Sequence, residues 1–495
     1  VTPPQWHEMF KERFKIPRVE DVREIPQHNL QIPTRSRQIG IFTVRDFLSK
    51  ISNKQYLLIN LLEAPLLAII LAFIIKYKSA PGGKEYIFRF NDNFPAFLLM
   101  SIIVALFMGL TVSAEEIIRD RKILKRESFL NLSWNSYLLS KVAVLFLISA
   151  IQTLTYVLIS NLILEVHGMN FAFWLVLFTT SCFANVLGLN ISSAFNSAVT
   201  VYVMIPLLLI PQMILSGLLF SFDKLNNLIS TKGKVPIVAD MMASRWAYEA
   251  MAVHQFTNNN YEAPYYDYEK EEAKADFKSS YLADELKKRN RWVLDNLNGK
   301  TDSIRTLVAK ELTVLRDELR DETFRQGIEK VNLDEVLIPG TYSKAFGEKL
   351  EKYVEKYRKS YQKMYNENVD LIEKKMAFYE NQGFRVNEEK NRYFNESLSD
   401  LVKNVNTKNR WLEYNGEIIQ QINPIFQEGV PKGALDYRAP FFAPHKNLFG
   451  ITVSTFLFNV LVIWAMTLFF YATLYFEWAK KGVDSFGKVN FPKRK

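Results

Sequence analysis

The sequence is poor in cysteine, since Cys182 is the only one among its 495 residues. A single thiol excludes an internal disulfide and any metal site built from several cysteines. Histidine is also scarce, and its five positions are too scattered for a zinc motif: His7, His28, His167, His254 and His445. The chain therefore has neither the disulfide framework of a small secreted domain nor the ligand spacing of a structural zinc site.

The polar middle of the chain carries no net charge. Between Asp223 and Lys446 there are 36 basic and 36 acidic residues, so the formal net charge of +10 comes entirely from the rest of the sequence. A nucleic-acid groove would need its basic stripe within this polar block. The balance therefore indicates no nucleic-acid partner and places the excess basic residues beside the apolar segments.

Long apolar runs are what the sequence does have, although its mean hydropathy of −0.05 hides them. Runs of about 20 residues with few charges are typical of transmembrane helices. The sequence predicts an all-α membrane protein with six such helices, at 56–75, 95–113, 136–163, 171–191, 199–221 and 449–476. A large, mainly helical domain, 222–446, is predicted between helices five and six.

Basic residues indicate the orientation of these helices. Five of them lie in the connector between helices two and three, and the tail 478–495 is basic as well. Cytoplasmic segments are enriched in Lys and Arg, so both are predicted to be cytoplasmic and 222–446 extracytoplasmic. The loop 76–94 is also basic, so the charge rule is not clean. We expect a multi-pass protein of the cell membrane, with the bacterial inner membrane as its setting and 222–446 in the periplasm.

The segments before the first helix have their own patterns. Residues 1–40 are polar and rich in proline, which is typical of a cytoplasmic linker, and no signal peptide follows Val1. We therefore expect the sequence to be the later part of a longer polypeptide. Residues 41–55 alternate an apolar stripe with a charged face, which predicts an amphipathic interfacial helix: Val44, Phe47, Leu48 and Ile51 against Arg45, Asp46, Lys50 and Lys54.

Three narrow apolar stripes recur in domain 222–446, with members three or four residues apart. They lie at 282–297, 304–319 and 346–364, and the turn signal Asn298–Gly299 separates the first two. Because charged residues surround them, the stripes predict antiparallel helical hairpins with a modest core. The predicted division ends with helix six in 447–477 and the basic cytoplasmic tail 478–495.

The connector 114–132 is the segment that points most directly to a mechanism. The sequence from Ser113 to Lys141 reads SAEEIIRDRKILKRESFLNLSWNSYLLSK, a short helix of alternating acids and bases followed by the start of the next membrane helix. Its candidate functional residues are Glu115, Glu116, Arg119, Arg121, Arg126 and Glu127. On the residues alone, a solvated loop whose arginines set the topology is the alternative.

This run resembles the coupling-helix region of ABC-2 type permeases, and in particular of G-subfamily-like ABC transporters. PQMILSGLLFSFDKLN at 211–226 is similar to that family's fifth helix, and LLINLLEAPLLA and FNVLVIWAMTLFFYATLYF are similar to its first and sixth. The resemblance implies that coupling helix 114–132 touches a nucleotide-binding domain, and that its six charged candidates transmit nucleotide-driven motion. It also implies a homodimer, with ATP and Mg on the associated nucleotide-binding domain.

The sequence departs from this family in two respects. It contains no GxxxxGK[ST] phosphate loop, no LSGGQ-like signature and no apolar strand ending in a catalytic acid pair, so no cofactor is expected on these residues. ATP hydrolysis would need an upstream segment or a separate subunit. The external domain 222–446 is also far longer than the family's usual external loop.

Polar residues and prolines near the membrane are further candidates. Glu63 lies about two turns into an apolar helix, where a charge is costly, so either substrate passage or a structural hydrogen bond explains it. Asn185 and Asn190 could line a pore or cap a cytoplasmic turn. Pro211 marks a bend that could act as a gate.

The segment SRWAYEAMAVHQF at 244–256 follows helix five and resembles the family's external re-entrant region. Arg245, Trp246 and Glu249 are predicted at the extracytoplasmic mouth of the pore, and a structural Arg–Glu pair is the alternative. No arrangement of residues indicates a catalytic or metal site.

The expected function is the permease part of an ATP-driven exporter, which couples nucleotide-binding-domain motion to outward substrate movement or envelope mechanotransmission. The alternative is a membrane-anchored scaffold whose extracytoplasmic helices bind an envelope complex without transport. Expected partners are membrane lipid, a nucleotide-binding domain, a second copy of the chain and an envelope protein. The substrate is not readable, because lipid, peptide, glycan and drug would all suit a weakly polar pore.

Overall fold

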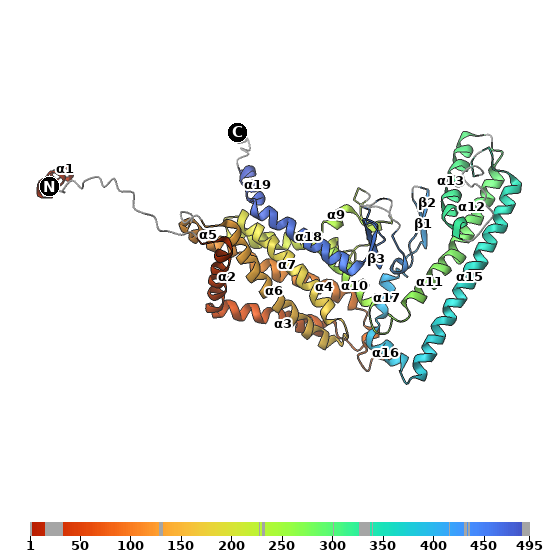
Figure 1. Ribbon diagram of the computed structural model, residues 1–495, viewed down its shortest axis with the longest axis horizontal. Coiled ribbons are helices and arrows are strands. Elements are labelled where there is room, and N and C mark those ends of the chain that lie inside the picture. The colour runs from red at the N-terminus through yellow and green to blue at the C-terminus, as the bar shows by residue number, and fades with distance from the viewer. Residues whose placement is uncertain are drawn as a thin grey trace.

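The protein consists of a bundle of long helices, the body, from one end of which a helical arm projects (Figure 1). This computed structural model describes residues 2–14, 33–127, 132–226, 228–229, 233–299, 301–325, 337–338, 340–414, 416–429, 433 and 436–487. Parts of the predicted linker and basic tail, 15–32 and 488–495, lie outside the described residues. Within the predicted linker, α1 (Pro3–Arg13) is a helix that starts at its prolines, as the fixed φ of proline favours.

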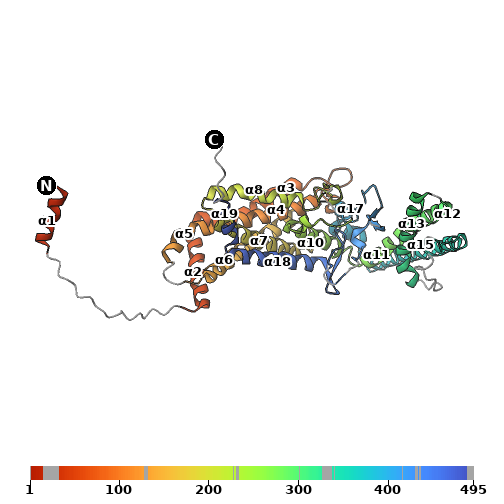
Figure 2. The same cartoon turned by 90° about the horizontal axis from the view of Figure 1, so that it is seen from above.

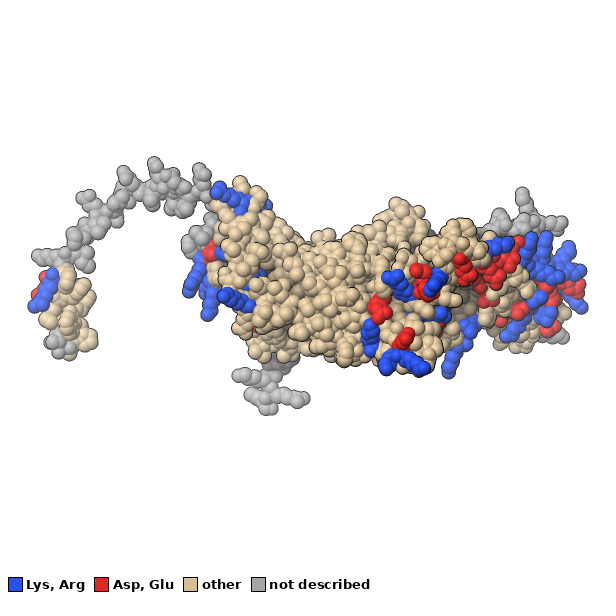
Figure 3. Space-filling model, turned by 90° about the horizontal axis from the view of Figure 1, so that it is seen from below, with Lys and Arg blue, Asp and Glu red and all other residues tan. Residues whose placement is uncertain are grey.

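Five helices of the body are long and apolar enough to cross a membrane: α3 (Lys54–Ile75), α4 (Phe94–Ser113), α6 (Trp134–Leu164), α7 (Asn170–Ala194) and α18 (Thr455–Tyr475). They match predicted helices one to four and six. A belt without charged side chains crosses this part of the surface, with Lys, Arg, Asp and Glu gathered at its two ends (Figure 3). The sequence pattern and the surface agree that the chain is a multi-pass membrane protein.

The fifth predicted helix is shorter than expected. Helix α8 (Ala198–Ile214) has only 17 residues, and the apolar residues that follow it form a turn instead of reaching position 221. Gly217 has φ +91°, and an added Cβ there would lie 2.6 Å from the ring of Phe441. A left-handed glycine packed against an aromatic ring ends the helix, although the hydropathy of the sequence continues.

The sixth predicted helix begins later than position 449. Residues 445–454 form a hairpin of β3 (His445–Leu448) and β4 (Ile451–Ser454), and α18 starts only at Thr455. The two turn residues, Phe449 and Gly450, both have positive φ, as a tight two-residue hairpin requires. The β-branched residues of Ile451–Ser454 favour a strand, which hydropathy alone does not distinguish from the start of a helix.

The segment directly after α8 belongs to the body. After the short η3 (Phe222–Lys224) and α9 (Ile237–Asp240), helix α10 (Ala243–Thr257) is buried along nearly its whole length and packs on α4, α7 and α18. Figure 2 shows α10 inside the body at the end nearest the arm. Residues 243–257 of the predicted domain 222–446 therefore pack within the body, and the helices that project from it begin after α10.

The arm comprises α11 (Tyr266–Asp276), the π-helical turn Phe277–Leu282, α12 (Ala283–Asn296), α13 (Asp302–Arg325) and α15 (Lys344–Asn381). Its own hydrophobic core contains Leu286, Val293, Leu312, Leu350 and Tyr357, so the predicted apolar stripes and helical hairpins are confirmed. The 38 residues of α15 give it a length of about 57 Å.

The chain returns from the arm to the body through α16 (Val386–Tyr393) and α17 (Glu396–Val402), which pack beside η1 (Phe88–Phe90), α4 and α10. An antiparallel hairpin, β1 (Trp411–Tyr414) with β2 (Glu417–Gln420), then contacts α13 of the arm, and η5 (Pro424–Phe426) contacts α11. These short elements brace the base of the arm against the body.

The opposite end of the body carries the remaining helices. Helix α2 (Arg35–Ser52) lies across the ends of the long helices, beside α5 (Glu116–Glu127), and α19 (Trp478–Gly487) lies at the same end of the body (Figures 1 and 2). The apolar stripe of α2 is exposed at Val44, Phe47, Leu48 and Ile51. The connector and the arm thus lie at opposite ends of the same bundle.

Candidate functional site

Helix α5, in the predicted coupling helix, is fastened to the end of α7 by reciprocal capping. The hydroxyl of Ser192 accepts hydrogen bonds from the backbone N–H groups of Ile117 (3.1 Å) and Ile118 (3.3 Å) in the first turn of α5. In return, the Arg121 guanidinium donates to the carbonyls of Ser193 (2.8 Å) and Phe195 (2.6 Å), where α7 ends. Each helix therefore satisfies free backbone groups of the other, and a shift of α5 must either move α7 or break these hydrogen bonds.

A buried group of charges, the connector cluster, joins α5 to two further helices. It consists of Asp46 and Lys50 of α2, Glu116 and Asp120 of α5, and Lys141 of α6. Glu116 accepts from the ammonium groups of Lys50 (2.8 Å) and Lys141 (2.9 Å), and Lys141 also pairs with Asp120 at 2.8 Å and with Asp46. Lys141 thus holds acids from two different helices at once.

The connector cluster makes the position of α5 depend on α2 and α6. Removing one partner of a buried ion pair leaves an uncompensated charge, which costs about 3–5 kcal/mol where burial is complete. Asp120 also accepts from the hydroxyl of Tyr137 on α6 at 3.1 Å. The three helices therefore move together or break these contacts.

The other predicted connector residues lie at the edge of this arrangement. Arg119 pairs with Glu116 at 3.1 Å, and Glu127 pairs with Arg45 of α2 at 2.8 Å. Glu115 and Arg126 are exposed. Of the six predicted residues, Glu116 is therefore buried, Arg121 is half-buried at the cap, Arg119 and Glu127 form ion pairs at the rim, and Glu115 and Arg126 are exposed.

Sequence reasoning did not assign Asp46, Lys50, Asp120 and Lys141 to this site. Asp46 and Lys50 were expected on the solvated face of an amphipathic helix, yet their side chains are only 8% and 5% exposed. A signal was present, because acid and base four residues apart on one helix face can form an ion pair. Their burial against α5 and α6 depends on tertiary packing, which the pattern does not contain.

A second buried group of charges, the α10 cluster, lies at the arm end of the body. Glu249 of α10 accepts from the ammonium of Lys446 (2.6 Å) on β3 and from the amide of Asn459 (2.8 Å) on α18. Arg245 lies 3.3 Å from Glu249 and 3.6 Å from Asp240. The cluster joins residues on both sides of the arm in the sequence.

The centre of the α10 cluster is fully enclosed, although Asp240 at its edge is 11% exposed, and burial shifts the titration of the central pair. The Lys446 and Glu249 side chains are 1% and 0% exposed. Burial by itself would raise the pKa of Glu249, but Arg245 and Lys446 favour its charged form more strongly and hold that pKa below its ordinary value. Burial lowers the pKa of Lys446 to about 8, because it outweighs the attraction of Glu249.

Trp246 is part of the same enclosure. The Arg245 guanidinium lies 3.8 Å from the centre of the Trp246 ring, a cation–π distance. The indole N–H of Trp246 donates to the carbonyl of Asp240 at 2.7 Å. Three residues were predicted at the extracytoplasmic mouth, and they are packed together inside the protein: Arg245, Trp246 and Glu249. Arg245 and Glu249 form the Arg–Glu pair that was the alternative.

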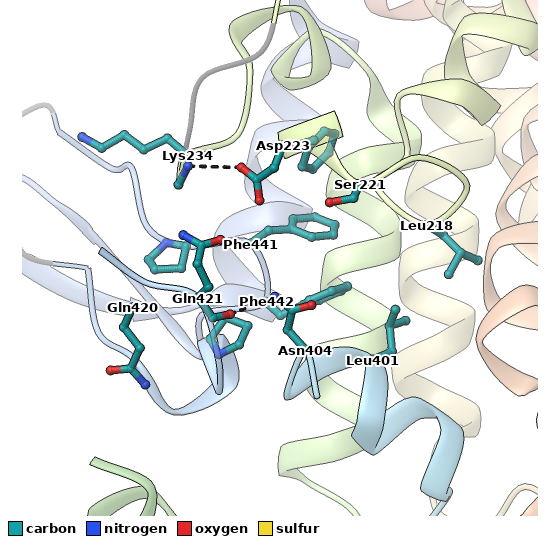
Figure 4. A pocket seen from close by; sticks show the side chains of 15 residues that line it. Leu218, Ser221, Asp223, Lys234, Leu401, Asn404, Gln420, Gln421, Phe441 and Phe442 are labelled. Atoms are coloured by element: carbon teal, nitrogen blue, oxygen red, sulfur yellow. Dashed lines mark hydrogen bonds between the residues drawn. The ribbon is translucent and has the colours of Figure 1, made fainter. Parts of the chain in front are cut away.

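A cavity of about 180 Å³ lies next to the α10 cluster. Figure 4 shows Asp223 and Ser221 on one side of it, Gln421 and Asn404 on another, and Phe441 and Phe442 between them. The backbone N–H of Phe442 donates to Glu249 at 3.3 Å. Phe442, which lines this mixed polar and aromatic cavity, thus connects it by a hydrogen bond to the α10 cluster.

The predicted pore or gate residues have separate environments. Asn185 donates to Ser149 of α6 at 2.7 Å, and Asn190 donates to the carbonyl of Phe470 on α18 at 2.8 Å. Glu63 is half-buried on α3. Pro211 interrupts the hydrogen bonding of α8, beside Gln212, whose side chain accepts from the N–H of Ser244 at 2.9 Å. The structure brings none of these four together.

No group of three or more His, Cys, Asp or Glu side chains within the described ranges is placed to hold a metal ion. The structure defines a multi-pass membrane protein with a connector helix bound to the end of its bundle. Residues 37–256, from α2 to the end of α10, match the family model of the ABC-2 type transporter, and no curated protein matches the chain. This part of the chain is similar to the membrane domain of ABC-2 type transporters, which supports a permease component of an ABC transporter.

Proposed function

We propose that the chain is the membrane part of an ATP-driven exporter, in which motion of a nucleotide-binding domain drives outward substrate movement or force transmission through the arm. The attachment of α5 to α7 by reciprocal capping is the observation that carries the proposal. A domain that pushes on the exposed surface at Glu115 and Arg126 would move α5, and the caps would pass the motion to α7.

The route from α7 to the arm also supports this proposal. Helix α7 contacts α5 at one end of the body and α10 nearer the other. Helix α10 holds Lys446 and Asn459 through Glu249, and it packs on α17, through which the chain returns from the arm. A packed series of helices therefore connects the connector with the base of the arm, the arrangement that a rigid-body switch requires.

ATP and Mg belong to a nucleotide-binding domain outside the residues of this chain, fused upstream or on a separate subunit. We propose that the connector lies on the cytoplasmic side of a bacterial inner membrane and that the arm lies in the periplasm. The resemblance to G-subfamily transporters and their homodimeric assembly is part of the same proposal.

One face of α8 supports the homodimer. Val199, Val203, Leu207 and Ile210 are all exposed, at intervals of three or four residues. Such a stripe on a short helix interrupted by two prolines suits packing against a second copy, with the substrate route near the two-fold axis.

The test uses full-length protein with its nucleotide-binding domain, reconstituted in nanodiscs, with a spin label at Lys359→Cys on the exposed face of α15. We expect vanadate trapping with ATP and Mg to change the distance between the labels of two copies. Arg121→Glu should abolish that change while ATP hydrolysis continues, because the cap between α5 and α7 is lost. Lys122→Glu, an adjacent and exposed charge reversal, serves as the matched control.

An equal response of both variants would contradict the coupling role of α5. The arm favours one second candidate, a scaffold that binds an envelope complex without transport, because it has its own core and projects from the body. A scaffold would retain its envelope partners in pull-down experiments and show the same label distance with and without trapped nucleotide.

A further inference from the structure

A cleft of about 920 Å³ opens at the connector end of the body, and none of its lining residues belongs to the connector cluster. It lies between the start of α2, the start of α6 and the junction of α18 with α19, and its walls include Arg35, Gln38, Trp134, Tyr475, Phe476 and Lys481. This volume is within the range of about 300–1,000 Å³ typical of ligand pockets. Its size alone does not identify a ligand, but the hydrogen bonds between its walls and the charge of its lining indicate one.

Hydrogen bonds between the three elements hold the cleft open. The side chain of Gln38 accepts from the N–H of Ser133 at 2.9 Å and donates to the carbonyl of Pro33 at 2.9 Å. The hydroxyl of Ser136 donates to the carbonyl of Arg35 at 3.2 Å, and Tyr471 of α18 donates to Asn135 of α6 at 2.6 Å. The walls are therefore fixed relative to one another before any ligand enters.

The cleft has an excess of positive charge. Arg35 and Lys481 are exposed at its walls, and in the part of the chain that the structure describes neither forms an ion pair. The one acidic side chain of the lining, Glu477, is paired with Lys480 at 3.1 Å. Two unpaired cations facing one hollow favour an anionic ligand, above all a phosphate.

The surroundings of the cleft are those of a membrane interface. Tyr475, Phe476 and Trp478 are 42%, 50% and 53% exposed, directly after the exposed apolar surface of α18 at Leu468 and Phe469. Aromatic side chains of this kind are enriched where acyl chains meet headgroups. Helix α2, whose first turn lines the cleft, also exposes apolar side chains further along its length, at Val44, Phe47 and Leu48.

We propose that this cleft binds the headgroup of an anionic phospholipid. Arg35 and Lys481 contact the phosphate, and the acyl chains lie along the exposed apolar surfaces of α18 and α2. Basic pockets between membrane helices on the cytoplasmic side have the chemistry of such sites. The bound lipid would join α2, α6 and α18, and therefore stabilise the helix that carries Asp46 and Lys50. Lipid binding does not depend on transport.

Native mass spectrometry of the full-length protein in detergent, titrated with phosphatidylglycerol, tests the proposal. We expect Arg35→Gln with Lys481→Gln to lower the apparent affinity of the first bound lipid at least tenfold. The matched control, Arg37→Gln with Lys122→Gln, removes the same charge from two exposed positions outside the cleft and should leave that affinity within a factor of two. Thermal unfolding without added lipid shows whether each variant is folded.

Three outcomes would overturn the proposal. Equal loss of lipid in both double variants would show that only overall charge matters. Equally tight binding of soluble glycerol phosphate would identify a site for a free anion. Unchanged lipid binding with loss of the nucleotide-binding domain from the cleft variant would identify a protein docking surface. If the double variant does not fold, the single variant Lys481→Gln, on the exposed surface of α19, replaces it.

Discussion

The connector cluster and the α10 cluster lie at opposite ends of one bundle and differ in how far their side chains are exposed to solvent. In the α10 cluster, Glu249 and Lys446 are enclosed and lie 197 positions apart in the sequence. In the connector cluster, Asp120 is 15% exposed, and Arg119 at the rim is 47% exposed. A sealed cluster acts as a fixed brace between the segments before and after the arm. A cluster with an open rim can be rearranged by a partner that touches α5.

The comparison predicts that the α10 cluster tolerates loss of a partner least. Glu249→Ala would leave Lys446 and Arg245 buried without their shared carboxylate, so we expect the free energy of unfolding to fall by about 3–5 kcal/mol. Thermal unfolding of the purified protein in detergent measures the change, with Glu348→Ala on the exposed surface of α15 as control. Glu249→Ala with Lys446→Ala should recover part of the loss. Equal unfolding temperatures for Glu249→Ala and the control would show that Glu249 does not hold together the segments before and after the arm.

A smaller loss is expected in the connector cluster. Lys141→Met leaves three acids near Lys50 and Arg119, but water can reach the rim, so we expect destabilisation of about 2 kcal/mol. In reconstituted full-length protein the same variant should weaken the nucleotide-dependent change in arm position. Lys122→Met is the matched exposed control. A larger loss of stability than for Glu249→Ala would reverse the comparison between the two clusters.

The enclosed lysine also predicts a pH dependence. The pKa of Lys446 is lowered to about 8 in the folded protein, whereas an unfolded lysine titrates near ~10.4. Between these values the unfolded chain binds more protons, so the free energy of unfolding rises with pH, by about 1 kcal/mol from pH 8 to pH 9. Below about pH 7 both states are protonated and this contribution is constant. Unfolding temperatures of the wild type and Lys446→Met should separate across this window, and parallel curves would show that Lys446 does not titrate there.

The smallest effect concerns the cap between α5 and α7. Ser192→Ala removes the acceptor for two N–H groups of α5, so we expect a loss of about 0.5–1 kcal/mol. Ser193→Ala is a close control, because the hydroxyl of Ser193 donates only within its own helix, to the carbonyl of Asn190 at 2.8 Å. Hydrogen exchange at Ile117 and Ile118 should increase in the first variant alone. Faster exchange in both variants would mean that fraying of α7 is responsible.

Much of this fold follows from local patterns in the sequence. Runs of about 20 apolar residues predicted five long helices, and three narrow stripes predicted α12, α13 and α15 of the arm, because hydropathy and helical periodicity are local properties. The end of α8 was placed too late, because the effect of Gly217 depends on the ring of Phe441, more than 200 residues away in the sequence. The start of α18 was placed too early, because the strand Ile451–Ser454 is as apolar as a helix start.

The candidate site was less predictable than the fold. The charged pattern at Glu116 and Arg121 was visible, but its partners Lys141 and Ser192 were not, since they come from other helices. The α10 cluster shows the same limit, because Arg245 and Glu249 are four residues apart whereas Lys446 follows the whole arm. Spacing within a helix identifies one side of such an arrangement, and tertiary packing supplies the other.

The base of the arm has a consequence for engineering. The rings of Tyr265, just before the arm, and Tyr379, near its end, lie 6.3 Å apart, and the ammonium of Lys375 donates to the carbonyl of Pro264 at 2.8 Å. The outgoing and returning chains therefore meet as neighbours where they leave the body. A short turn could replace everything beyond that point, and another folded module could be grafted there without altering the helices in the membrane.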